Sequence, residues 1–182
     1  FSAIATATTA GPNLTVTFIT VGSGVTVGGD TTTVASTTNA IAFGSLNIGS
    51  YNAAAHTVRV TTNATAGYTT TIQQDGNLRK GNGDFVAPVS GTNAVPSTWP
   101  VGITAGYFGY HTTDSNLCTG TSSRFSTNNT YAQFSSTAYE VACSAVPVTN
   151  EDTTVVYKLE VGNLQQSGNY QNIITLITTA QF

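Results

Sequence analysis

Apolar and polar residues alternate with a period of two along much of the chain. The alternation is clearest over residues 14–21 (LTVTFITV), 56–62 (HTVRVTT), 68–73 (YTTTIQ) and 154–161 (TVVYKLEV). In these segments Val, Ile, Leu, Phe or Tyr mostly alternates with Thr or another polar residue, which is typical of strands with one face on a core. In the last of these segments, the alternation predicts that Lys158 and Glu160 face outward.

Two further strands and a turn are predicted from the sequence pattern. Residues 41–46 (IAFGSL) predict a short strand, and the turn-forming residues 63–67 (NATAG) predict a hairpin between the strands on either side. Residues 170–179 (YQNIITLITT) predict the last strand. Because this segment is apolar on both faces, we expect it to be a central strand.

Residues 77–153 differ in composition from the rest of the chain. They contain four of the five prolines, both cysteines and the single tryptophan. Strand signals there are short, over residues 86–89, 101–110 and 131–134. No charged linker or break in composition marks a domain boundary, so we interpret the region as a loop-rich insert in one domain, residues 13–182.

Threonine takes the place of charged residues in this protein. The chain has 35 Thr, 15 Ser and 15 Asn among 182 residues, and 7% of its residues are charged, against about 25% in average soluble domains. A net charge of −3, with 8 Tyr, 8 Phe and 1 Trp, argues against disorder. Thr suits the solvent face of a strand. We therefore expect an all-β fold: a single Ig-like or jelly-roll-type antiparallel β-sandwich with long loops.

Residues 1–12 are predicted to form an N-terminal strand extension. The segment alternates weakly and ends at Gly11-Pro12, but it has too little bulk to be stable as a strand by itself. It is either a disordered tail or a strand that pairs with another chain. In the second case its anchors would be Phe1, Ala3, Ile4, Ala5 and Ala7.

Charge and hydropathy limit the possible partners. Five Lys and Arg residues spread along the chain leave no basic patch, so we expect no nucleic-acid binding. The apolar runs are too short to span a bilayer, so we expect no membrane insertion. The chain starts at Phe1 without a signal-peptide pattern, which predicts a processed, secreted protein.

Cys118 and Cys143 are the two cysteines, and their spacing matches no zinc or redox motif. Two interpretations remain open, a disulfide in an oxidising compartment and a pair of buried thiols. The extracellular type of composition favours the disulfide.

The chain lacks recognisable catalytic and metal-binding motifs. His56 and His111 occur without a nucleophile motif, and no phosphate-binding or dinucleotide-binding glycine pattern is present. Acidic residues near Asp75 and near Glu151 are too few for a calcium loop. We therefore expect a protein that is not an enzyme, with no catalytic residues, metal or other cofactor.

Two features leave room for glycans. Glycosylation sequons begin at Asn13, Asn63 and Asn128, although a chain so rich in Ser and Thr contains several by chance. Aromatic residues gather in and after the Gly-rich stretch 99–110, where they either stack on a sugar or fill the core beneath a loop. The residues of this possible ligand platform are Trp99, Tyr107 and Tyr110, with Phe108 and Tyr131 nearby.

Lys158 allows one covalent possibility. Some pilin domains join a Lys to an Asn beside an acidic residue. Asn169 or Asn172 would face Lys158 if the last two predicted strands paired.

Three motifs resemble those of secreted, Thr/Ser-rich bacterial β-sandwich surface proteins, including fimbrial, spore-coat and biofilm-fibre proteins. They are F-G-x-L at residues 43–46, V-x-V-x-T-N-A-x-x-G-Y at residues 58–68 and G-x-Y-x-x-x-I-T at residues 168–175. The similarity covers about residues 14–76 and 153–182. It implies an extracellular β-sandwich and a location at the cell surface.

These observations predict a structural subunit of an extracellular filament or cell-surface layer. Subunits would join head to tail by donor-strand complementation, in which residues 1–12 of one copy add a strand to the next, so the main partner is the chain itself. The alternative is a monomeric cell-surface adhesin or carbohydrate-binding module that uses the aromatic residues.

Overall fold

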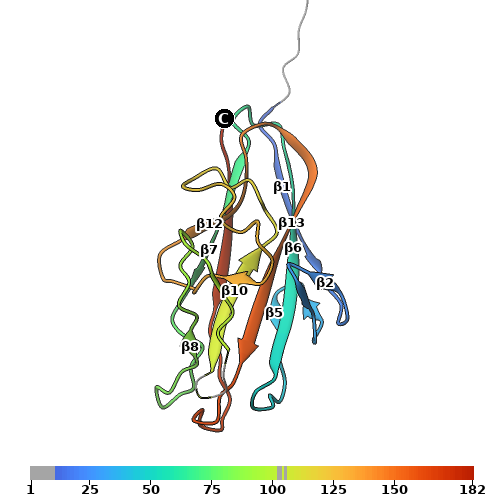
Figure 1. Cartoon of the computed structure of the whole chain (residues 1–182). Coiled ribbons are helices and arrows are strands. Elements are labelled where there is room, and N and C mark those ends of the chain that lie inside the picture. Colours follow the sequence, from blue (N-terminus) through green and yellow to red (C-terminus); the bar gives the residue numbers. More distant parts are fainter. Residues whose placement is uncertain (1–10, 102–103, 105) are drawn as a thin grey trace, which may run out of the picture.

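The structure is a computed structural model that describes residues 11–101, 104 and 106–182. These residues form strands and loops, and no helix among them is long and apolar enough to cross a membrane. Figure 1 shows two facing sheets that form an elongated sandwich. The predicted all-β sandwich is confirmed.

The larger sheet has five strands in the order β1-β6-β13-β10-β8. All neighbours pair antiparallel except the short β8 and β10, which are parallel. The strand bounds are β1 Leu14–Thr20, β6 Tyr51–Thr62, β13 Val148–Glu160, β10 Tyr107–Thr112 and β8 Ala87–Pro88.

The smaller sheet has three antiparallel strands in the order β12-β7-β14. Their bounds are β12 Tyr139–Ser144, β7 Tyr68–Gln74 and β14 Ile174–Ala180. Six two-residue strands form separate ribbons: β2 Thr26–Val27 with β3 Asp30–Thr31, β4 Ser36–Thr37 with β5 Ala40–Ile41, and β9 Ser97–Thr98 with β11 Thr130–Tyr131.

The period-two alternation places one face of each long strand in the core. On β6, Val58 and Val60 are buried, and on β7 the same holds for Tyr68 and Ile72. Arg59 of β6 and Thr69 and Thr71 of β7 lie on the other face and are half-buried. Thr70 shares the inner face with Tyr68 and Ile72 and is buried. Full burial of each such Val, Ile or Leu side chain contributes about 1.5–3 kcal/mol, which makes this core the main stabilising feature.

The region 77–153 supplies both strands and core residues. Its β10 lies within the larger sheet and its β12 forms one edge of the smaller sheet. Buried aromatic residues from this region pack against β13, with the Phe134 and Tyr157 rings stacked at 6.1 Å. The prolines and loops of this region therefore surround an integral part of the sandwich.

The predicted hairpin at residues 63–67 is wrong. β6 belongs to the larger sheet and β7 to the smaller one, so the turn carries the chain from one sheet to the other. Gly67 has φ 72°, and a Cβ there would lie 2.0 Å from the Ser144 carbonyl oxygen. The turn-forming residues are explained by this crossing.

The predictions of a central strand over residues 170–179 and of a short strand over residues 41–46 are also wrong. The last strand, β14, is an edge strand, and Ile173 and Ile177 remain 66% and 47% exposed on its outer side. Residues 41–46 form no continuous strand, because β5 ends at Ile41.

Lys158 and Glu160 are buried, at 5% and 8% exposure, although they face away from the sandwich core as predicted. The β2–β3 ribbon and the loop after β9 cover them, since Asp30 and Trp99 contact these two side chains. β13 and β14 lie in different sheets, so the condition for a link from Lys158 to Asn169 or Asn172 is not met.

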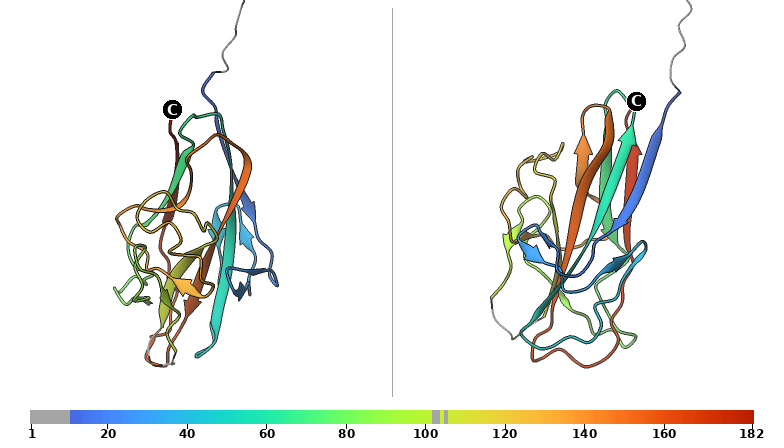
Figure 2. Two further views of the ribbon diagram at one scale, coloured as in Figure 1. Left: turned by 45° about the horizontal axis from the view of Figure 1, so that its top comes forward. Right: turned by 90° about the vertical axis from the view of Figure 1, so that its right-hand side faces the viewer.

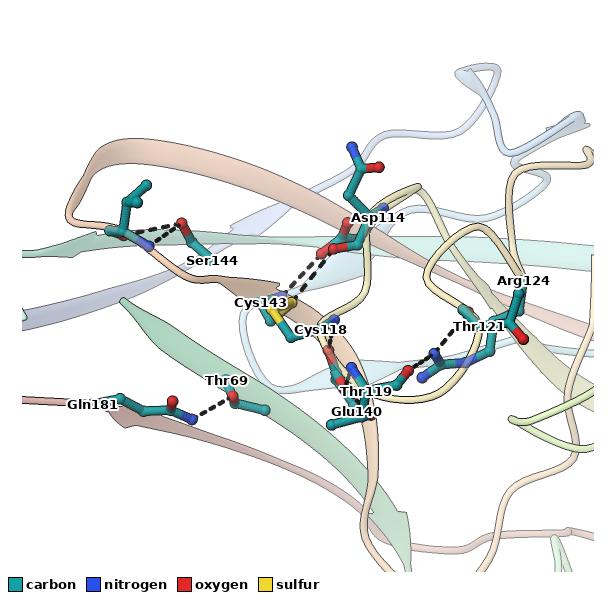
Figure 3. Close-up of a disulfide and its surroundings, with 12 residues drawn as sticks. Thr69, Asp114, Cys118, Thr119, Thr121, Arg124, Glu140, Cys143, Ser144 and Gln181 are labelled. Carbon is teal, nitrogen blue, oxygen red and sulfur yellow. Dashed lines mark hydrogen bonds between the residues drawn. A yellow bond between two sulfur atoms is a disulfide. The ribbon is translucent and has the colours of Figure 1, made fainter. Parts of the chain in front are cut away.

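A disulfide joins Cys118 to Cys143, with a Cα–Cα distance of 6.0 Å, as predicted. It fastens the loop after β10 to strand β12 (Figure 3). Backbone amides of Cys118 and Thr119 donate to the buried carboxylate of Glu140, and the Cys143 amide donates to Asp114 at 2.9 Å. The loop is therefore held by both covalent and hydrogen bonds.

Candidate functional site

A large groove lies between the two sheets. Its volume is about 1460 Å³, beyond the range of about 300–1,000 Å³ typical of small-molecule pockets. The groove exists because the three-stranded sheet is narrower than the sheet it faces. Figure 2 shows that β1 and β14, the last strands of their sheets, lie at the same side of the sandwich.

The walls of the groove are apolar and incompletely covered. Phe18 of β1 and Leu176 of β14 line it, and both are only half-buried, although they pack against the core. Tyr157 and Leu159 of β13 lie deeper and are 2% exposed. A sandwich with a fourth strand beside β14 would bury the half-exposed side chains.

Residues 38–48 run along the groove without pairing as a strand beyond β5. Ile41, Phe43 and Leu46 are half-buried and pack against the core. The segment holds its place by side-chain packing, with the Phe43 ring edge against the Phe108 ring at 6.4 Å. Ile48, at the end of this segment, lines the groove and is 58% exposed.

The described residues that line the groove include no Asp, Glu, Lys or Arg. The histidine among them, His56, has its Nε2 2.5 Å from the Thr37 carbonyl oxygen. Glutamine and asparagine side chains of residues 165–172 supply polar groups on one rim. An uncharged, extended ligand with apolar side chains fits this surface best.

Two strand edges flank the groove. Within the described chain, β1 pairs only with β6, and β14 pairs only with β7. Each therefore has one side whose backbone N–H and C=O groups have no strand neighbour. Such edges are the usual sites at which an extended peptide adds to a sheet.

The predicted donor segment is only partly described. Phe1, Ala3, Ile4, Ala5 and Ala7 lie outside the described residues, which begin at Gly11. Asn63 holds the start of the described chain, since its Oδ1 accepts from the Asn13 amide at 2.8 Å and its Nδ2 donates to the Gly11 carbonyl at 2.7 Å.

The aromatic residues suggested for sugar binding lie in two different surroundings. Tyr110 is 1% exposed, its hydroxyl accepts from Asn93 Nδ2 at 2.9 Å, and burial raises its pKa to about 12. Trp99 packs edge-on against Tyr107 and Tyr131, with ring centroids 6.4 and 5.0 Å away. Tyr110 packs against Phe125 and Phe134 in the core, whereas Trp99 and Tyr107 are half-buried.

The remaining sequence candidates lie apart. Asn13, Asn63 and Asn128 are all exposed. His111 is buried, with Nδ1 2.8 Å from the Thr130 carbonyl oxygen, and burial lowers its pKa, so the ring stays neutral near pH 7. One cluster with metal-ligand atoms was found in the described chain, Cys118, Glu140 and Cys143, but its two sulfurs are joined to each other.

The groove-lining role of residues 38–48 and the half-buried face of β14 were not predicted from the sequence pattern. One signal was present, because residues 170–179 are apolar on both faces. A strand that is apolar on both faces is either a central strand or an edge strand that another segment covers. Only the order of strands in the sheet distinguishes the two cases.

Comparison of the sequence with protein-family models and with curated proteins finds no match.

Proposed function

We propose that this protein is a structural subunit of an extracellular filament or cell-surface layer, in which the groove of one copy receives residues 1–10 of the next as an added strand. The observation that carries the proposal is the open groove between two strand edges, whose described lining has no Asp, Glu, Lys or Arg. Residues 1–10 are themselves free of charged side chains, so they match the groove in polarity.

The length of the segment is sufficient for this role. Ten extended residues span about 33 Å, whereas the seven residues of β14 span about 23 Å. Phe1 and Ile4 are its bulky apolar residues, and Ala3, Ala5 and Ala7 are its small apolar residues. Because positions 1 and 4 lie on opposite faces of a strand, one of the two bulky side chains would face the core and contribute about 1.5–3 kcal/mol, in addition to the main-chain hydrogen bonds.

The positions of the chain ends support head-to-tail contacts. Residues 11–13 lie at the end of the sandwich that also carries the C-terminus, whereas the loops around Gly49 and Val161, which bond to each other, lie at the opposite end (Figure 1). A segment entering from a neighbour at that opposite end would run antiparallel to β14. Repetition of such a contact does not close on itself and produces a filament.

Several other properties agree with this role. The disulfide and the composition suit an oxidising environment outside the cell, which is part of the proposal.

For the alternative, a monomeric adhesin, Tyr110 is too deeply buried to stack on a sugar, and Trp99 and Tyr107 are half-buried. We therefore favour the structural subunit.

Deletion of residues 1–12 is expected to remove filaments. The secreted full chain and the chain 13–182 would be compared by negative-stain electron microscopy at equal concentration. The full chain should form filaments and the deleted chain should remain as single particles, because the donor strand is gone. Filaments of both chains would place the joint elsewhere, and single particles of both would contradict the filament proposal.

A further inference from the structure

Lys158 and Asp30 form a buried pair on the outer side of the larger sheet. Lys158 lies on β13 and Asp30 on the β2–β3 ribbon, with Lys158 Nζ 2.7 Å from Asp30 Oδ1. Their side chains are 6% and 4% exposed. The two groups come from positions 128 residues apart, so the fold itself brings them together.

Aromatic rings form the surroundings of the amine. Lys158 Nζ lies 4.2 Å from the ring centroid of Tyr51, 5.0 Å from that of Trp99 and 5.1 Å from that of Tyr131. The Trp99 ring is held in place because its Nε1 donates to Glu160 Oε2 at 2.7 Å. These rings exclude water and stabilise a cation through their faces, but they do not solvate a carboxylate.

The carboxylate is incompletely satisfied. Asp30 Oδ2 is buried and has no hydrogen-bond partner in the described chain. A buried ion pair costs more in lost solvation than it gains unless its remaining atoms are hydrogen-bonded. Transfer of one proton from the ammonium to the carboxylate produces a neutral amine and a carboxylic acid in contact, and these are the forms that condense to an amide.

We propose that Lys158 and Asp30 join in an intramolecular isopeptide bond. Lys158 Nζ attacks Asp30 Cγ, a C–N bond forms, and one of the two Cγ–O bonds breaks. The departing oxygen leaves as water with two hydrogens, one from the amine and one from the acid. The step changes no oxidation state and needs no further reactant.

The arrangement favours this step in two ways. The amine is held against the carboxyl group, and well-oriented intramolecular reactions reach effective concentrations of about 10⁵–10⁸ M. Condensation also removes both buried charges and one of the two carboxyl oxygens, so the orphaned oxygen no longer has to be accommodated. The bond fastens the β2–β3 ribbon to the middle of the larger sheet, and it is independent of the groove.

Mass spectrometry of the purified full chain, reduced and denatured, tests this proposal. We expect most molecules to be lighter than the sequence mass by one water. Trypsin should then leave Lys158 uncleaved and release a branched peptide that joins residues 1–59 to residues 125–182, because cleavage follows Arg59 and Arg124.

Two variants separate the proposal from other water losses. Lys158→Arg should have its full sequence mass, since the guanidinium does not condense. Asp30→Asn should lose one ammonia in place of one water, because the amide nitrogen is then the leaving group. A wild-type chain at its full sequence mass, or a water loss that persists in Lys158→Arg, would overturn the assignment. Circular dichroism of each variant would verify that it is folded.

Discussion

Replacement of Ile48 by Glu is expected to abolish filament assembly, whereas Val95→Glu should leave it unchanged. Ile48 lines the groove and is 58% exposed in the single chain, so a carboxylate there is hydrated until a neighbouring segment covers it. Assembly would then bury an unpaired charge, at a cost of several kcal/mol. Since about 1.4 kcal/mol corresponds to a tenfold change in an equilibrium constant, assembly should weaken by at least about a hundredfold.

Val95 provides the matched control. It is 72% exposed, lies on the loop before β9 and does not line the groove. Sedimentation of both variants measures the assembled fraction, and thermal unfolding of the single chains verifies that both remain folded. Equal assembly of the two variants would mean that the groove is not the contact surface.

Removal of the disulfide is expected to lower the free energy of unfolding more than removal of any other interaction between two side chains. The bond closes a loop of 25 residues, and in the chain-entropy model a loop of this size contributes about 3 kcal/mol by restricting the unfolded chain. The double variant Cys118→Ala/Cys143→Ala should therefore have a free energy of unfolding lower by about 3 kcal/mol. Urea denaturation with a common slope measures the difference.

The loop that contains Cys118 is also held by hydrogen bonds, so their contribution must be separated from that of the disulfide. The Cys118 amide donates to Glu140 and the Cys143 amide donates to Asp114, and both remain available in the double variant. The wild-type chain under reducing conditions should lose a similar amount of stability. A loss below about 1 kcal/mol in both experiments would show that the loop is held mainly by these hydrogen bonds.

The period-two pattern predicted the fold class because a strand with one buried face imposes it directly. Val58 and Val60, or Tyr68 and Ile72, are buried as their alternation requires. The same pattern does not identify which sheet a strand joins. Residues 63–67 have the composition of a hairpin turn, yet they cross between sheets, and both connections need the same turn-forming residues.

The burial of the outer face of β13 was also not predictable from the sequence pattern. Lys158 and Glu160 lie on the outer face that their charge predicts, but the β2–β3 ribbon and Trp99 cover them. The groove also depends on a difference in width between two sheets, which is a property of the whole arrangement. Local periodicity carries no information about either feature.

The most direct test of strand donation is the binding of a synthetic peptide of residues 1–12 to the chain 13–182. We predict saturable binding at one peptide per chain, with NMR shift changes at Leu176 and Ile48 in the groove and none at Val95. A peptide with the same composition in scrambled order should bind at least about tenfold more weakly, since the positions of its bulky side chains no longer match the groove. Absence of binding, or shift changes away from the groove, would contradict the account.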